Sequence, residues 1–194
     1  PPPKYNGKWY RSTDVIASIS KVTHDIVNKV APEVENHYIP HAVNDKVFRK
    51  VEQEHVNKFI EENFPEHNGR TIFFWNNRNA RRKHSGTLVS WFNKFAEEVG
   101  PENVCLIMHT DPKDPNGQDL HQLIEDMGIA DGRVILSTKK LPPEALSMMY
   151  NMADCTINIS DAEGFGLATL ESLSCGTPII VNMTGGLQEQ VTDG

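Results

Sequence analysis

Asp154-Cys155-Thr156-Ile157-Asn158-Ile159-Ser160 is followed, after two further residues, by Glu163-Gly164-Phe165-Gly166-Leu167-Ala168-Thr169-Leu170-Glu171. The first segment is short, apolar and rich in β-branched residues, which predicts a buried strand. In the second segment apolar residues recur at helical spacing from Leu167, and Gly176 and Pro178 end that helix. Together the two segments predict a strand, a glycine-containing loop and a helix.

The loop of this unit carries groups suited to a phosphate that is flanked by hydroxyls. Two glycines without a Cβ let backbone amides approach a ligand closely. The amides at the helix N-terminus favour an anion, and they belong to Gly164, Phe165, Gly166 and Leu167. Glu163, before the helix, and Glu171, in its second turn, can each accept hydrogen bonds from hydroxyls. A phosphate with hydroxyls on both sides describes a sugar nucleotide.

Strands and helices alternate along most of the chain. Strands are predicted at 71–75, 104–109, 133–136, 155–159 and 178–182, and helices at 85–99, 120–127, 143–152 and 166–175. Before them we expect a strand at 14–20, a helix at 21–30 capped by Ser20, a short strand at 38–44, a helix at 49–63 and a loop at 65–70. This alternation predicts an α/β, Rossmann-like parallel sheet with helices on both faces.

A cluster of cations follows the strand at 71–75. Arg78, Arg81, Arg82 and Lys83 lie within six residues of a chain whose net charge is −7. Ligands of such sheets bind beyond the carboxyl ends of the strands, where this cluster and the two glutamates are both expected. The topology therefore predicts cations and carboxylates at one edge of the sheet.

Composition excludes several other classes of protein. The negative charge argues against non-specific nucleic-acid binding, and no apolar run approaches the ~20 residues that span a bilayer. Cys105, Cys155 and Cys175 form no close pair, which predicts free buried thiols in a reducing compartment, and no signal peptide is recognised, so we expect a cytoplasmic protein. The eight histidines show no metal-site spacing, so no metal site is expected.

Residues 163–171 resemble the paired-glutamate motif of retaining glycosyltransferases of GT-B architecture, family four of the sugar transferases. Residues 175–181 look like that family's next strand, and Gly185-Gly186-Leu187-Gln188-Glu189 looks like its Gly-Gly-x-x-Glu turn. The resemblance covers roughly residues 36–194. It implies that the chain is similar to the C-terminal, donor-binding domain of a GT-B enzyme.

The resemblance also implies roles for single residues. Arg78 and Lys83 match the spacing of an Arg and a Lys that contact the donor diphosphate, although Asn77 and His84 stand where the family has glycine. Glu163 would hold hydroxyls of the transferred sugar and Glu171 those of the ribose. Arg81 and Arg82 are interpreted as a solvated face. No divalent metal and no cofactor beyond the nucleotide-sugar substrate is implied.

The same resemblance suggests a domain organisation. Residues 1–35 would be the tail of an N-terminal acceptor domain, 36–48 the interdomain hinge with a structural His41, and 49–194 the donor domain, expected to be truncated at its C-terminus. We therefore expect the 194-residue chain alone to bind a nucleotide sugar without catalysing transfer.

The leading interpretation is a glycosyltransferase that moves a sugar from a nucleotide-diphosphate sugar, with retention of configuration, to an unknown carbohydrate, lipid or protein acceptor. The alternative is a non-catalytic nucleotide-sugar binding module. A dinucleotide oxidoreductase would need Gly-x-Gly-x-x-Gly after its first strand, where this chain has Trp75-Asn76-Asn77-Arg78.

Overall fold

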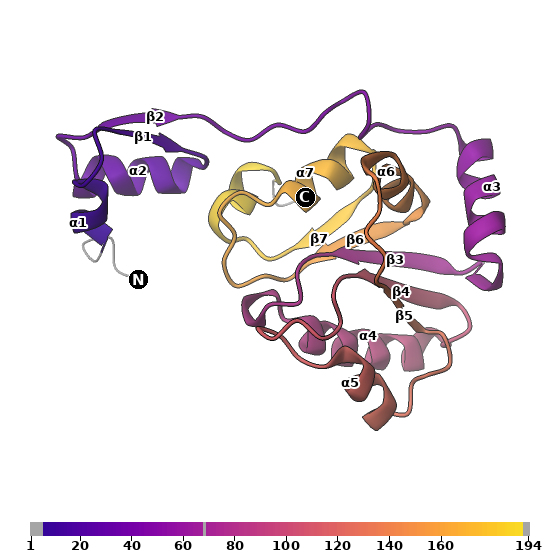
Figure 1. Cartoon of the computed structure of the whole chain (residues 1–194). Coiled ribbons are helices and arrows are strands. Elements are labelled where there is room, and N and C mark those ends of the chain that lie inside the picture. The colour runs from indigo at the N-terminus through magenta and orange to yellow at the C-terminus, as the bar shows by residue number, and fades with distance from the viewer. Residues whose placement is uncertain (1–5, 68, 192–194) are drawn as a thin grey trace. The chain divides into compact units, whose positions relative to one another are not determined.

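The computed structural model describes residues 6–67 and 69–191, which divide into two compact units (Figure 1). The larger unit holds residues 43–161 and 168–182, and the smaller one holds the described residues of 1–42, 162–167 and 183–194. Three predictions extend beyond the described residues, because the expected acceptor-domain tail includes 1–5, the loop at 65–70 includes Asn68, and the expected donor domain includes 192–194.

The larger unit is built on a parallel sheet of five strands in the order β5-β4-β3-β6-β7. The strands are β3 (Thr71–Asn76), β4 (Val104–His109), β5 (Val134–Ser137), β6 (Cys155–Asn158) and β7 (Ile179–Val181). All of them lie where the sequence predicts strands. The α/β class with a parallel sheet is therefore confirmed.

The central strands are apolar because both of their faces are covered. In β4 the residues from Val104 to Met108 are at most 4% exposed, and Phe74 of β3 pairs in register with Ile107 on one side and Thr156 on the other. A strand buried on both faces reads as a continuous apolar run rather than an alternating one.

Helices cover both faces of this sheet (Figure 1). Their bounds are α3 (Gln53–Asn63), α4 (Ser85–Val99), α5 (Leu120–Asp126), α6 (Pro143–Met152) and α7 (Leu167–Ser174). One apolar core joins Trp75, Leu106 and Met108 to residues of α4 and α5. The other core joins Phe74, Ile107 and Tyr150 to residues of α3 and α6.

The prediction that α3 begins at Arg49 is wrong, since the helix begins at Gln53. Asn151 of α6 explains the difference. Its side-chain oxygen accepts from the backbone N–H of Val51 at 2.8 Å, and its amide donates to the carbonyl of Arg49 at 3.0 Å. These tertiary bonds hold residues 49–51 outside the helix, which begins only at Gln53.

The smaller unit contains α1 (Gly7–Tyr10) and a parallel pair of strands, β1 (Val15–Ser18) and β2 (Glu35–Tyr38), joined by α2 (Lys21–Val30). The predicted cap of α2 is confirmed, because the Ser20 hydroxyl accepts from Thr23 N. The predicted strand at 38–44 is wrong. The strand ends at Tyr38, where Ile39 N donates to Ser18 O, and Pro40 has no N–H to extend the ladder.

The carboxylate of Glu189 links α2 and β2 within this smaller unit. Glu189, in a 3-10 helix over Gly185–Glu189, accepts from the first backbone N–H of α2, at Lys21, and from the Tyr38 hydroxyl at 2.8 Å. The glutamate of the Gly-Gly-x-x-Glu turn therefore caps a helix N-terminus.

No helix among the described residues is long and apolar enough to cross a membrane.

Candidate functional site

The strand order changes direction between β3 and β6. The chain runs outward from β3 through β4 to β5, then returns to the other side of β3 with β6 and β7. Ligands of open α/β sheets bind at such a point, beyond the carboxyl ends of the strands. The loops that follow β3 and β6 meet here, because Asp161 N donates to Arg82 O at 2.9 Å and the Asp161 carboxylate lies 2.7 Å from His84 Nε2.

Of the cations in the loop over residues 77–84, Arg78 has a partner that the sequence did not suggest. Its guanidinium donates from Nε to Asp114 Oδ2 at 2.6 Å and from Nη2 to Oδ1 at 3.2 Å. This hydrogen bonding holds the pKa of Asp114 well below its usual range. Arg78 remains 64% exposed, and Nη1 makes neither of these bonds. Its guanidinium can therefore serve Asp114 and an anionic ligand together.

Lys83 occupies a different environment in the same loop. It is 6% exposed, and its ammonium donates to Asn77 Oδ1 at 2.7 Å. Arg81 and Arg82 are exposed, in agreement with a solvated face. Near them, Arg81 and His84 line a cavity of about 290 Å³ together with Asn116 and Gly117.

A buried asparagine fixes this cation loop to the loop after β4. Asn79 is fully buried, and its amide donates to Gln118 O at 2.7 Å and to Pro112 O at 3.3 Å, while its oxygen accepts from Ser85 Oγ at 2.6 Å. Sequence reasoning missed Asn79 and Asp114. An asparagine inside a cationic loop was the available signal, because an amide can satisfy carbonyls of a neighbouring segment.

His84 directly follows the cations and has an unusual backbone. Its φ is 56°, the one positive φ of a non-glycine residue in the described part of the chain. It precedes α4, and Leu88 N donates to its carbonyl. Glycine adopts a positive φ without strain, which explains why the family has glycine at this position. The histidine found here adopts the same φ at the cost of backbone strain.

The loop over residues 163–167 belongs to the smaller unit. Gly166 has φ 94°, a conformation that favours glycine. A Cβ on Gly164 would lie 3.6 Å from Ile19 Cδ1 and would fit. Phe165 is 8% exposed, its ring lies edge-on to His41, and its carbonyl accepts from Gln190 at 2.6 Å. The structural role expected for His41 stays a prediction.

Two further glycines let the chain approach this loop. A Cβ on Gly185 would lie 1.8 Å from the Glu163 carbonyl oxygen, and one on Gly186 would lie 2.6 Å from Phe165 Cα. Gly186 N also donates to Glu163 O at 3.1 Å. The Gly-Gly pair therefore supports the backbone of the glutamate loop.

Glu171 lies in α7 and is held by α6. The Tyr150 hydroxyl donates to Glu171 Oε2 at 2.6 Å and accepts from Asn76 Nδ2 at 2.8 Å. Burial raises the pKa of Glu171, and the bond from Tyr150 opposes that rise. Sequence reasoning found Glu171 but missed Tyr150 and Asn76, because a tyrosine inside an apolar helix looks like a core residue.

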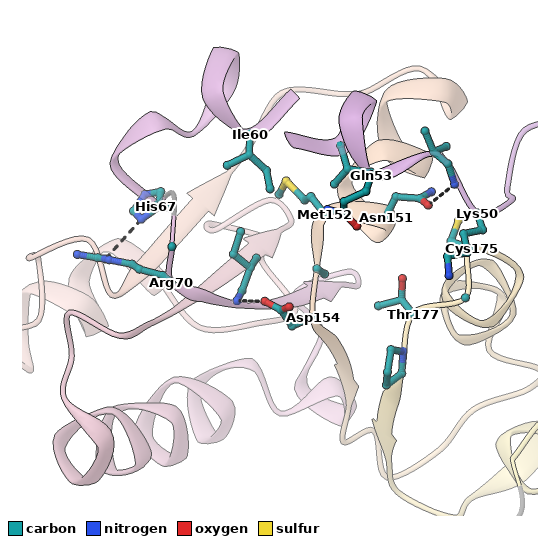
Figure 2. Close-up of a pocket in the computed structure, with 17 residues that line it drawn as sticks. Lys50, Gln53, Ile60, His67, Arg70, Asn151, Met152, Asp154, Cys175 and Thr177 are labelled. Atoms are coloured by element: carbon teal, nitrogen blue, oxygen red, sulfur yellow. Dashed lines mark hydrogen bonds between the residues drawn. The ribbon is translucent and has the colours of Figure 1, made fainter. Parts of the chain in front are cut away.

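A separate cavity of about 350 Å³ lies at the opposite, amino edge of the sheet. Figure 2 shows Asp154, the residue before β6, bonded to the backbone of Ile72, with Arg70 bonded to His67 near one side. Because this cavity is at the edge away from the loops after β3 and β6, it is not the predicted site. Among residues 6–67 and 69–191, no group of three or more metal-ligating side chains could hold an ion.

The larger unit is therefore an α/β domain whose candidate ligand site lies at the point where the strand order changes direction. The model of the family described as glycosyl transferases group 1 matches residues 56–194. The chain belongs to that family, so the predicted resemblance to glycosyltransferases is confirmed.

Curated relatives match over a shorter stretch. D-inositol 3-phosphate glycosyltransferase of Acidothermus cellulolyticus is 41% identical over 75 residues, which is 39% of this chain and 16% of that protein. The enzyme of the same name from Frankia alni is 35% identical over 86 residues, 41% of this chain and 21% of that protein. The chain thus spans a small part of the relatives it matches.

Solved structures match over nearly the whole chain. A sucrose-phosphate synthase from Thermosynechococcus elongatus is 25% identical with a TM-score of 0.77, covering 98% of this chain and 46% of that one. HepE of Anabaena, solved with UDP and glucose, is 18% identical with a TM-score of 0.77 and covers 100% and 53%. The chain has the fold of about half of each of these proteins.

Proposed function

We propose that this chain supplies the nucleotide-sugar site of a retaining glycosyltransferase of sugar-transferase family four, which takes a sugar from a nucleotide-diphosphate donor. One observation carries the proposal. Residues 77–84 and Asp161 meet where the strand order changes direction, beyond the ends of β3 and β6. There Tyr150 also links Glu171 by hydrogen bonds to Asn76, the last residue of β3. Cations for a diphosphate and a carboxylate for hydroxyls thus come from one end of the sheet.

In this proposal each residue has its own part. Arg78 and Lys83 stabilise the negative charge that develops on the leaving diphosphate, with help from the amides of residues 164–167. Glu163 accepts from hydroxyls of the sugar, and Glu171 accepts from hydroxyls of the ribose. We propose no metal and no further cofactor, a cytoplasmic location, and an acceptor bound outside this chain.

Ligand binding tests the diphosphate assignment. We expect UDP, GDP or ADP to raise the Tm of the chain, as a ligand that binds only the folded state must do. Arg78→Ala and Lys83→Ala should each weaken binding of the diphosphate by roughly ten- to a hundredfold, since a charge-assisted hydrogen bond contributes ~1.5–3 kcal/mol. Binding of the bare nucleoside should change little, and salt should reduce the difference.

Arg81→Ala is the matched control, because it removes the same charge from the same loop at an exposed position. It should leave the affinity for the diphosphate within about twofold of wild type. Equal losses from Arg78→Ala and Arg81→Ala would refute a specific diphosphate contact. Equal losses for diphosphate and nucleoside would indicate a folding defect instead.

A further inference from the structure

Tyr150 of α6 bonds to both β3 and α7 in the larger unit. It is 1% exposed, its hydroxyl bonds to Asn76 and Glu171, and its backbone carbonyl accepts from Thr177 Oγ1 at 2.7 Å. Its ring lies edge-on to Phe74 at 5.2 Å. The position of the hydroxyl is therefore fixed by the apolar core and not by the ligand loops.

The direction of the two hydrogen bonds follows from the proton count. A tyrosine hydroxyl has one proton, and an ionised glutamate can only accept. The proton of Tyr150 therefore points to Glu171 Oε2, and the oxygen of Tyr150 accepts from the Asn76 amide. This leaves Glu171 Oε1 as the carboxylate oxygen that no described group occupies.

We infer that Tyr150, fixed by Asn76, is a positioning residue that takes one oxygen of Glu171 and leaves the other for the ribose hydroxyls of the donor. The inference rests on the proposed function, in which Glu171 contacts the ribose. Asn76 is the last residue of β3, directly before the cation loop. Through Tyr150, the carboxylate proposed to bind the ribose is therefore held in place relative to β3 and the cation loop that follows it.

The bond also favours the ionised form of Glu171. Burial raises the pKa of this carboxyl, and the hydrogen bond from Tyr150 lowers it. The ionisable groups that face Glu171 in the described elements are Tyr150 of α6 and Cys175, and burial raises the pKa of both, so neither adds a charge near neutral pH. Without the tyrosine hydroxyl, Glu171 should take up a proton at a higher pH than in wild type.

Tyr150→Phe tests the inference, because it removes the hydroxyl and keeps the ring. We expect the affinity for whichever of UDP, GDP and ADP binds the wild type to fall by about three- to tenfold, as for one lost hydrogen bond. The 2′-deoxy form of the same nucleotide should lose less. The loss should grow as the pH is lowered, since protonated Glu171 no longer accepts two hydroxyls. Tyr10→Phe, outside this network, is the control.

A double-mutant cycle separates positioning from mere structure. In a Glu171→Ala background, Tyr150→Phe should no longer change the affinity, because its effect passes through the carboxylate. Asn76→Ala, which removes the donor to the tyrosine oxygen, should give a smaller loss of the same kind. It also serves as the second variant if Tyr150→Phe does not fold.

The outcomes are distinguishable. If the wild type binds none of the three nucleotides, the proposed function fails and the inference fails with it. If the wild type binds but Tyr150→Phe or Asn76→Ala leaves the ribose preference and its pH dependence unchanged, the positioning role alone is refuted. The same result follows if Tyr150→Phe weakens binding equally with and without Glu171.

Discussion

Two loops that follow neighbouring strands are held by opposite means. The cation loop over residues 77–84 is fixed mainly by side chains, through the buried amide of Asn79 and the ion pair of Arg78 with Asp114. The glutamate loop over residues 163–167 is approached by Gly185 and Gly186, whose lack of side chains lets their backbone contact it.

The difference shows two ways to hold a ligand-binding backbone in place. Buried hydrogen bonds fix a loop that must also carry several charges, because each bond satisfies a carbonyl that would otherwise be left without water. Close backbone contact fixes a loop whose own amides are proposed to bind the ligand, since no side chain then blocks them. The comparison predicts that the two loops differ in the kind of substitution that disrupts them.

The largest effect is expected from Gly185→Ala. Its Cβ would meet the Glu163 carbonyl at 1.8 Å, and its φ of 52° is unfavourable for alanine. We expect a loss of about 2–4 kcal/mol in the free energy of unfolding, from overpacking and backbone strain together. Thermal unfolding and nucleotide titration would both register the displaced loop.

Gly128→Ala is the matched control for this prediction. Gly128 has φ 67°, but a Cβ there would meet no atom within 4 Å. Gly128→Ala should therefore lower the free energy of unfolding only through backbone strain, by about 1 kcal/mol, and should leave the nucleotide affinity unchanged. Equal losses from the two variants would show that the backbone conformation, and not the close contact with Glu163, is what matters.

Asn79→Ala should have the next largest effect. It removes a buried amide and leaves the carbonyls of Pro112 and Gln118 and the Ser85 hydroxyl without their partner. We expect a loss of about 2–3 kcal/mol in the free energy of unfolding, measured by denaturant titration. Ser85→Ala breaks only one of these bonds and should lose about 1 kcal/mol. If Asn79→Ala and Ser85→Ala lower the free energy of unfolding equally, Asn79 does not tie the two loops together.

The smallest effect is expected from His84→Gly. Glycine relieves the strain at φ 56° but gives up the contact of His84 with Asp161 and loosens the unfolded chain. These terms should cancel to within about 0.5 kcal/mol. His84→Ala keeps the strain and loses the contact, so it should be less stable than His84→Gly by about 1 kcal/mol. Thermal unfolding of the pair would decide it, and the reverse order would exclude strain at this residue.

The sheet could be predicted well because its strands carry their own signal. The continuous apolar runs of β3 and β4 indicate strands that are buried on both faces. Glycines and prolines between the elements mark where each strand or helix ends. The start of α3 could not be predicted. It depends on Asn151, which lies about a hundred residues further along the chain and bonds to residues 49–51 only in the folded protein.

The candidate site shows the same limit. Charge and topology place the cation cluster and Glu171 at one edge of the sheet, and the resemblance to the family singles out Arg78 and Lys83 within that cluster. Asp114, Asn79 and Tyr150 could not be predicted, because their importance comes from which segment they meet across the fold. Such contacts form between segments that are far apart in the sequence, so no local sequence pattern predicts them.

The return of the chain to β3 also bears on the order in which the protein folds. β4 joins β3 after a single helix, whereas β6 pairs with β3 only after two further strands and three helices have been made. Closing that longer loop costs more chain entropy, so we expect β3, β4 and β5 to assemble first and β6 to dock later. A nascent chain would therefore hold its cations in place before Glu171 arrives, and the proposed nucleotide site would be complete only after β6 and α7 have docked.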